Sequence, residues 1–306
     1  MKKVAVIIGS GGQDGTLLTL KLKSLNYEVI GVKRGDIDLL NIEEVSELIL
    51  SKQPDEVYHL AAYHHSSEDS VNNEVDIFKR SIDVHTISVN NLLDAIDKHK
   101  NNCRFFYASS CLIFEGSDKK LLTENSPYSF ENFYAISKIS GGSLIKYYRD
   151  NKKIFACSGF LFNHESSLRT ENYLSKKITS FVAQVNKSSK QKLILGSLDM
   201  KVDWGYAPDY VDAFWKILQH SSPDDYIVAT GVKSSVKDFV KIAFEHVNLD
   251  YRDYVIVDSN VLSRRNSTRI GSAEKLMKNT GWKPSIDFYE MVGILVDQEI
   301  ERFKSN

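Results

Sequence analysis

Tyr134 and Lys138 stand four residues apart in a segment, 133–148, whose apolar spacing predicts a helix. Residues four apart on a helix share one face, so the phenol and the amine can meet. A nearby ammonium lowers the pKa of a phenol, and a phenolate near neutral pH can take the proton from a carbinol as hydride leaves for a nicotinamide. The pair therefore indicates redox chemistry at an alcohol carbon.

Hydroxyl groups that could assist this pair lie about one strand–helix unit earlier. A strand is predicted over 103–108, and Ser109 and Ser110 follow at its end, where hydroxyls can hydrogen-bond the same carbinol. Cys111 comes next and has two interpretations, an acid or base and a small buried side chain. Serine, tyrosine and lysine in this chain order form a more specific signal than Tyr-x-x-x-Lys alone.

A glycine-rich turn near the N-terminus is the candidate dinucleotide site. Gly9, Gly12 and Gly15 follow a short apolar strand, Val4–Ile8, and open a helix predicted over 16–25. Glycines at this spacing suit a tight turn, close approach of the backbone to a pyrophosphate, and close helix–sheet packing. The start of the helix then offers N–H groups and a positive dipole end to the phosphates.

The charges that follow the second predicted strand, 27–32, bear on which dinucleotide binds. Lys33 and Arg34 stand at its end, where a basic residue favours the 2′-phosphate of NADP and an acidic one the ribose hydroxyl of NAD. Asp36 and Asp38 follow closely and keep NAD as the alternative. NADP is the predicted cofactor.

Strand-like and helix-like segments alternate through the first half of the chain, which predicts an α/β fold with a Rossmann-type doubly wound parallel sheet. After Phe162 the pattern is less regular. We expect a dinucleotide-binding domain over 1–162 and a smaller, mainly substrate-binding domain over 163–306, partly interleaved with the first. The remaining predicted strands are 56–61 and 154–160, and the remaining predicted helices are 42–51, 77–98, 173–184, 207–219 and 236–247.

Composition excludes several classes of protein. The 306 residues carry 39 Lys and Arg against 40 Asp and Glu, so there is no general attraction to nucleic acid or to an anionic membrane. No apolar run approaches the ~20 residues that span a bilayer. The three cysteines are an odd number without metal-like spacing. We expect a soluble cytoplasmic protein with no metal site.

Longer stretches resemble the extended short-chain dehydrogenase/reductases and, more narrowly, the GDP-mannose 4,6-dehydratase family. The most specific are Asn-His-Glu-Ser at 163–166 and Lys-Ile-Thr at 177–179. The glycine turn also matches, with Gln13 and Asp14 inside it. The other matching stretches are 31–34, 53–62, 134–138, 195–199, 203–205, 229–231 and 281–284.

The resemblance implies a GDP-sugar substrate that is oxidised at C4. It implies that Asn163 and Lys177 contact the nucleotide diphosphate, a suitable task for an amide and a lysine. It also implies a homo-oligomer, with a dimer formed through the two long helices near 77–98 and 133–148. The residues that the resemblance assigns to the cofactor, besides the glycines and the cations, are Gln13, Asp14, Asp36, Leu60, Ala61, Ala62 and Lys138.

The catalytic turn departs from the family pattern. The family has Ser-Thr-Ser-Glu, and its glutamate removes the C5 proton so that water leaves C6. Leu112 stands at the glutamate position here and cannot act as a base. Glu115, three residues on, and Cys111 are the candidate replacements.

Two further departures concern the diphosphate and the subunit contacts. The arginine that precedes Asp-Trp-Gly in the family is Val202 here, and Arg264, Arg265 or Arg269 are candidates to replace it. The long loop that follows the Lys-Arg pair at 33–34, and that crosses to a neighbouring subunit in the family, is missing. The usual tetramer is therefore in question.

The turn at 109–113 is closer to GDP-fucose synthase, a 4-keto-sugar epimerase-reductase. There the equivalent cysteine and a later histidine handle protons at C3 and C5, and His164 is the positional match for that histidine. Three functions stay open. The leading one is a GDP-mannose 4,6-dehydratase type of enzyme. The alternatives are a GDP-4-keto-sugar reductase, epimerase or C4 dehydrogenase, which tolerates Leu112, and an inactive cofactor-binding homologue.

Overall fold

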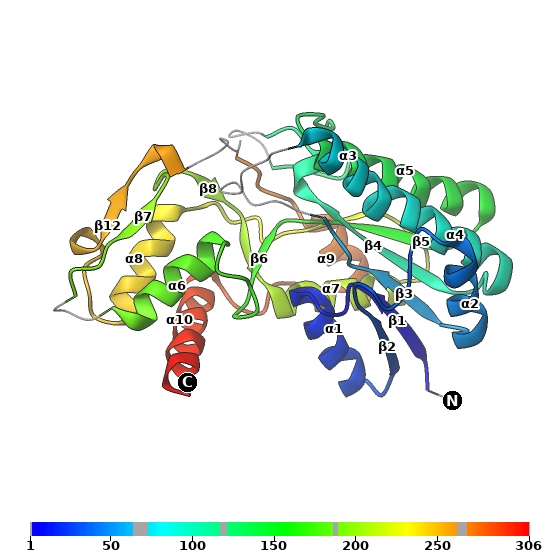
Figure 1. Cartoon of the computed structure of the whole chain (residues 1–306), viewed down its shortest axis with the longest axis horizontal. Coiled ribbons are helices and arrows are strands. Elements are labelled where there is room, and N and C mark those ends of the chain that lie inside the picture. The colour runs from blue at the N-terminus through cyan, green and yellow to red at the C-terminus, as the bar shows by residue number, and fades with distance from the viewer. Residues whose placement is uncertain (1, 64–72, 117–120, 186–188, 262–267, 306) are drawn as a thin grey trace.

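The centre of the molecule is a six-stranded, all-parallel sheet in the order β10-β5-β4-β3-β1-β2 (Figure 1). The computed structural model describes residues 2–63, 73–116, 121–185, 189–261 and 268–305. Each sheet strand is a short apolar run, as in sheets that are covered on both faces. The strands are β1 (Val4–Ile8), β2 (Glu28–Val32), β3 (Glu56–His59), β4 (Arg104–Ser110), β5 (Phe155–Leu161) and β10 (Tyr226–Val228).

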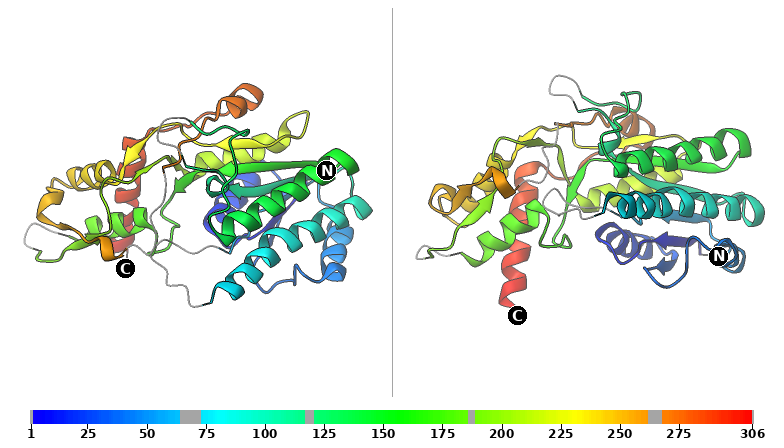
Figure 2. Two further views of the ribbon diagram at one scale, coloured as in Figure 1. Left: turned by 90° about the horizontal axis from the view of Figure 1, so that it is seen from above. Right: turned by 45° about the horizontal axis from the view of Figure 1, so that its top comes forward.

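Alternate residues of each strand enter two separate hydrophobic cores. Ala5 and Ile7 of β1 pack into a core with α1 (Gln13–Ser24), α7 (Ala207–Gln219) and α9 (Glu274–Thr280). Val6 and Ile8 pack into the opposite core. The helices of that second layer are α2 (Ile42–Lys52), α4 (Ser88–His99) and α5 (Phe133–Lys152). Figures 1 and 2 show the two helical layers on opposite sides of the sheet, so the predicted doubly wound architecture is confirmed.

The long helix predicted over 77–98 is interrupted. The chain forms α3 (Glu74–Ile82), a π-helical turn η1 (Asp83–Ile87) and then α4. The wider turn brings buried His85 edge-on to the ring of Tyr134, with 5.1 Å between ring centroids. Single π-turns of this kind occur at functional sites and have no periodicity that a sequence pattern reveals.

Most of the chain after β5 forms a second unit, at the left of Figure 1. Its core contains stacked and edge-on aromatic rings, Trp204, Phe239 and Phe288 among them. Three small pairs of strands, β6 with β9, β7 with β12 and β8 with β11, complete it. Its elements are β6 (Asn163–Glu165), α6 (Leu174–Gln184), β7 (Leu193–Leu195), β8 (Lys201–Val202), β9 (Trp204–Tyr206), β11 (Ser234–Ser235), α8 (Val236–His246), η3 (Tyr251–Asp253), β12 (Val255–Val257), η4 (Ser259–Val261) and α10 (Phe288–Lys304).

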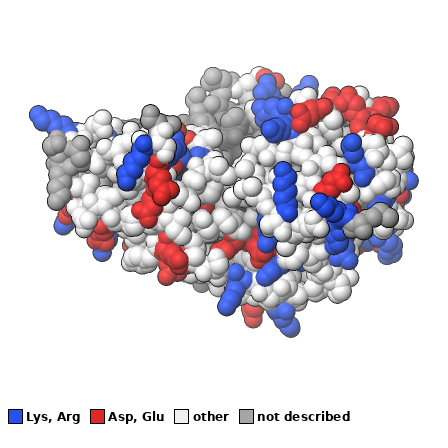
Figure 3. Space-filling model, turned by 90° about the horizontal axis from the view of Figure 1, so that it is seen from below, with Lys and Arg blue, Asp and Glu red and all other residues white. Residues whose placement is uncertain are grey.

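Three elements from this later part of the chain return to the sheet. Strand β10 extends its edge beside β5, and α7 and α9 cover one face. Charge on the face drawn in Figure 3 is mixed, with Lys and Arg interspersed among Asp and Glu. Among the described residues, no helix has the length and apolarity needed to cross a bilayer.

Candidate active site

A cavity of about 330 Å³ lies where the carboxyl ends of β3, β4 and β5 face the second unit. Ligands of open parallel α/β sheets bind at this edge. Both halves of the chain contribute to the lining. The sheet side provides Leu60, Ala62, Ser110, Leu112, Tyr134 and Lys138, and the other side provides Asn163, Arg169, Tyr173, Trp204 and Arg269.

The glycine turn has the shape that a dinucleotide pyrophosphate requires. Gly9 has φ +88°, and a Cβ there would lie 2.7 Å from the backbone nitrogen of Ala61. A Cβ on Gly15 would lie 2.3 Å from the carbonyl oxygen of Gly9. Helix α1 begins after Gly12 with no side chain capping its first amides. These N–H groups therefore suit phosphate oxygens, and the turn fits the predicted cofactor.

The acidic residues after β2 bind their own backbone. The carboxylate of Asp36 accepts a hydrogen bond of 2.7 Å from the amide of Lys33, and that of Asp38 accepts one of 3.0 Å from Leu40. Lys33 and Arg34 are exposed, and the alkyl chain of Lys33 borders the glycine turn at Gly11. The side chain of Lys33 therefore lies beside the glycine turn, whereas the carboxylates of Asp36 and Asp38 are engaged by backbone amides.

Tyr134 and Lys138 lie on α5, which begins at the Asn132 cap, and Lys138 is 1% exposed. Its Nζ donates a 2.7 Å hydrogen bond to the carbonyl of Ala108 and lies 5.8 Å from the centroid of the Tyr134 ring. Burial lowers the pKa of Lys138 to about 7. The amine can therefore gain or lose a proton near neutral pH.

The phenol of Tyr134 is half-buried at the cavity. Burial raises its pKa above the ordinary value, and a hydrogen bond with Ser110 offsets only part of that rise. Desolvation disfavours the phenolate, so the direction of this shift is opposite to the lowering expected from a neighbouring ammonium. Ser110, Tyr134 and Lys138 do come together at the cavity, as a neutral phenol beside a hydroxyl and an amine.

Among the described residues after β4, 111–116, no carboxylate lines the cavity. Leu112 lines the cavity. Glu115, the predicted replacement for the missing glutamate, is exposed and is not among the lining residues. Cys111 lies in η2 (Cys111–Ile113) and lines the cavity, and burial raises the pKa of its thiol to about 12.

The predicted substrate residues are dispersed. Asn163 is exposed and lines the cavity, whereas Lys177, on α6, is half-buried and is not a lining residue. Arg269 lines the cavity, is buried, and donates from Nε to the carbonyl of Phe114 at 2.8 Å. Arg264 and Arg265 lie outside the described residues.

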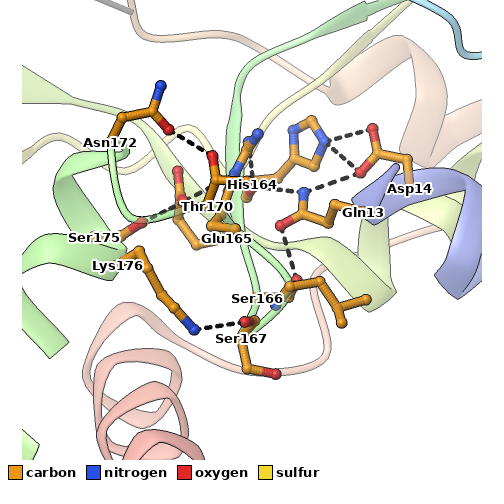
Figure 4. Close-up of polar contacts among 12 residues, drawn as sticks. Gln13, Asp14, His164, Glu165, Ser166, Ser167, Thr170, Asn172, Ser175 and Lys176 are labelled. Atoms are coloured by element: carbon orange, nitrogen blue, oxygen red, sulfur yellow. Dashed lines mark hydrogen bonds and ion pairs between the residues drawn. The ribbon is translucent and has the colours of Figure 1, made fainter. Parts of the chain in front are cut away.

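His164 lines the cavity and is hydrogen-bonded to the protein on both ring nitrogens. Its Nε2 lies 3.0 Å from Oδ2 of Asp14 (Figure 4). Its Nδ1 lies 2.7 Å from the carbonyl oxygen of Phe162. The ring is stacked on Tyr210 with 4.4 Å between centroids. Burial alone would raise the pKa of Asp14, but the charge and hydrogen bonds of His164 outweigh it and lower that pKa to about 2.

Arg169 and Tyr173 are cavity residues that the sequence analysis did not identify. The guanidinium of Arg169 donates to Glu165 at 3.2 Å and to the carbonyl of His164 at 2.7 Å, and it lies over the ring of Tyr173 at 4.3 Å. The spacing of four between Glu165 and Arg169 was the available signal. That spacing suggests a pair only on a helix, whereas here Glu165 ends strand β6 and Arg169 lies in the loop that follows.

A dinucleotide turn on a doubly wound sheet, with Ser110, Tyr134 and Lys138 at its carboxyl edge, defines an extended short-chain dehydrogenase/reductase. Comparison with known families narrows this class. The family model described as GDP-mannose 4,6 dehydratase matches residues 35–295, and the chain belongs to this family.

Individual relatives agree with that assignment. GDP-mannose 4,6 dehydratase 2 of Arabidopsis thaliana is 32% identical over 335 residues, which cover 99% of this chain and 88% of that protein. Among solved structures, RMD from Pseudomonas aeruginosa complexed with NADPH has a TM-score of 0.83 and 20% identity and covers 99% of both chains. The dTDP-glucose 4,6-dehydratase of Bacillus anthracis in complex with NAD has a TM-score of 0.82, 15% identity, and coverage of 99% of this chain and 98% of that one. At these identities the two structures support the fold.

Proposed function

We propose that the protein modifies a GDP-linked sugar by NADP-dependent redox chemistry at C4, in the manner of the GDP-mannose 4,6-dehydratases. The observation that carries the proposal is the meeting of Ser110, Tyr134 and Lys138 in one cavity that Asp14 of the glycine turn also lines. The family to which the chain belongs supplies the GDP-sugar as the substrate class.

The residues of the chain divide the work as follows. Oxidation at C4 requires the phenolate of Tyr134, so the proton that the phenol carries first passes to the neutral amine of Lys138. The phenolate then takes the proton of the carbinol, and the phenol gives it back to the C4 oxygen when the sugar is reduced. Ser110 hydrogen-bonds both the phenol and the C4 oxygen. Lys138, with a pKa of about 7, replaces the proton of the phenol. NADP, when bound, accepts and returns the hydride.

The preference for NADP rests on Lys33 and Arg34. RMD is complexed with NADPH and the dTDP-glucose dehydratase with NAD, so the fold accommodates either nicotinamide. We expect the double variant Lys33→Ala/Arg34→Ala to lose at least tenfold in affinity for NADPH and little for NADH, measured by fluorescence titration. Equal losses for both would contradict the choice of NADP.

A mass measurement tests the reaction. Purified protein incubated with GDP-mannose, without added cofactor, is expected to yield a product lighter by one water. The variant Tyr134→Phe is expected to be slower by about 10²- to 10⁴-fold. Tyr147→Phe is the matched control, because Tyr147 is exposed on the same helix. An active wild type and an inactive Tyr134→Phe variant would also exclude the inactive-homologue interpretation.

A second candidate, a GDP-4-keto-sugar reductase or epimerase, is compatible with the residue at position 112. Leu112 faces the cavity where the family has its elimination base, and Glu115 is not a lining residue. Reduction of a ketone at C4 needs no such base. Consumption of NADPH with a GDP-4-keto-6-deoxy sugar, together with no loss of water from GDP-mannose, would select this candidate over the dehydratase.

Three further parts of the proposal concern organisation. We propose a division into 1–162 and 163–306, with β10, α7 and α9 returning to the first part. We propose a dimer through the surfaces of α3, α4 and α5, which light scattering of the purified protein would test.

The three cysteines are free thiols and buried, which is compatible with a reducing compartment, and we propose the cytoplasm as the place of action.

A further inference from the structure

We infer that Asp14 and a doubly protonated His164 form a positioning pair, which holds the substrate-facing strand β6 in register with the dinucleotide turn. The inference deepens the proposed function and, for its kinetic part, rests on it. Neither residue is assigned a step in proton or hydride transfer.

The first argument is connectivity. Asp14 is the second residue of α1 and lies inside the glycine turn, between Gly12 and Gly15, and His164 is the middle residue of β6, 150 positions later. Gln13 adds two contacts to the same segment: its Nε2 donates to the carbonyl of His164 at 3.2 Å, and its Oε1 accepts from Ser166 at 2.8 Å. Figure 4 shows these side chains meeting between the two elements. The first turn of α1 is thus hydrogen-bonded to His164, inside β6, and to Ser166, the residue that follows β6.

The second argument concerns the protons of His164. The carbonyl of Phe162 only accepts hydrogen bonds, and the ionised carboxylate of Asp14 also only accepts. A neutral imidazole has one N–H and would leave one of these contacts without a proton. Both nitrogens donate only in the imidazolium form, and the ionised Asp14 compensates its charge. No ring nitrogen then remains for the substrate, so a role as general acid or base is disfavoured.

The third argument is the support of the ring. Tyr210, on α7, is stacked on the imidazole at 4.4 Å with an interplanar angle of 16°. A Cβ on Gly205 would lie 2.3 Å from the Tyr210 ring, so the glycine makes room for that stack. His164 is 7% exposed. The geometry fixes the ring from its face and from both edges, as a positioning role requires.

What the pair positions is Asn163, the neighbour of His164 on β6 and a lining residue of the cavity. Displacement of a bound group by about 1 Å can reduce a rate by about 10²-fold. We expect Asp14→Asn and His164→Phe each to lower kcat about 10- to 100-fold, while the Kd for NADPH alone and for GDP alone change less than about threefold. Phenylalanine retains the stack on Tyr210, and asparagine retains the shape of Asp14.

A double-variant cycle separates positioning from catalysis. If the pair acts as a unit, Asp14→Asn/His164→Phe is no slower than the slower single variant. Losses that multiply, or a Kd for NADPH that rises more than tenfold in Asp14→Asn, would overturn the inference. Asp212→Asn is the matched control, because Asp212 on α7 also pairs with α1, through Lys21 at 2.6 Å. Its kcat is expected to equal that of the wild type.

A second measurement needs no turnover. Nitrogen NMR of ¹⁵N-histidine-labelled wild-type protein, with His164 assigned by comparison with a His164 variant, reports the protonation of each ring nitrogen. We expect both nitrogens of His164 to carry protons at about pH 7. One unprotonated nitrogen would overturn the inference even if the enzyme is active, and two protonated nitrogens would support it even if the proposed reaction fails. Should His164→Phe not fold, His164→Gln provides the assignment.

Discussion

Replacing the buried Lys138 by methionine should abolish activity and yet stabilise the protein at neutral pH. The pKa of Lys138 falls from 10.5 to about 7 on burial, so the folded state disfavours the charge that the unfolded chain carries freely. Between those two pH values the unfolded chain holds a proton that the folded chain has released. The stability of the wild type therefore rises with pH in this window, and burial of the lysine costs most at or below about pH 7.

The size of the effect follows from the shift. At about 1.4 kcal/mol per pKa unit, burying the ionisable amine lowers the unfolding free energy of the wild type by roughly 4 kcal/mol near pH 7 and by roughly 2 kcal/mol near pH 9. Methionine has a similar shape and no charge. The hydrogen bond from Lys138 to Ala108 is lost in the variant at both pH values. The stability gap is the difference in unfolding free energy between Lys138→Met and the wild type. Its change with pH therefore reports only the ionisation of the Lys138 amine.

Urea unfolding of wild type and Lys138→Met at about pH 7 and about pH 9 measures this gap. We expect the variant to be more stable near pH 7 and its advantage to shrink by about 2 kcal/mol near pH 9. Lys23→Met, at an exposed position of α1, is the control and should show a gap that does not change. A Lys138→Met gap that stays constant or widens with pH would refute the argument that desolvation controls this lysine.

Three other perturbations have definite expected outcomes. Gly15→Ala places a methyl group 2.3 Å from the Gly9 carbonyl oxygen. We expect a loss of about 3 kcal/mol in unfolding free energy and weaker NADPH binding. An unchanged urea midpoint together with an unchanged Kd for NADPH would count against the tight turn. Glu299→Leu leaves buried Lys176 without its carboxylate partner and should lower the unfolding free energy by about 3–5 kcal/mol; an unchanged urea midpoint would contradict this. Asp14, with its pKa lowered to about 2, contributes stability that is complete above about pH 4 and lost as the pH falls through 2, so Asp14→Asn should flatten the acid unfolding profile in that range.

The parallel sheet and the position of the catalytic helix were predictable because their signals are local. The apolar run Val4–Ile8 and the helical spacing around Tyr134 hold regardless of what packs on them. Helix α10 and edge strand β10 were not among the predicted elements. Strand β10 has only three residues, and its place beside β5 depends on a crossover through the second unit that no local pattern reports.

The amino-acid sequence alone determined which groups are available: a glycine turn, a phenol, an amine and a serine hydroxyl in the order of a short-chain dehydrogenase/reductase. Only the tertiary structure decided their states. It placed Tyr134 at the half-buried edge of the cavity, where desolvation raises the pKa of the phenol, left Glu115 exposed, and joined His164 to Asp14 across 150 residues. The reason is physical: residue type and spacing are local properties, whereas desolvation and hydrogen-bond partnership depend on segments that meet only when the chain folds.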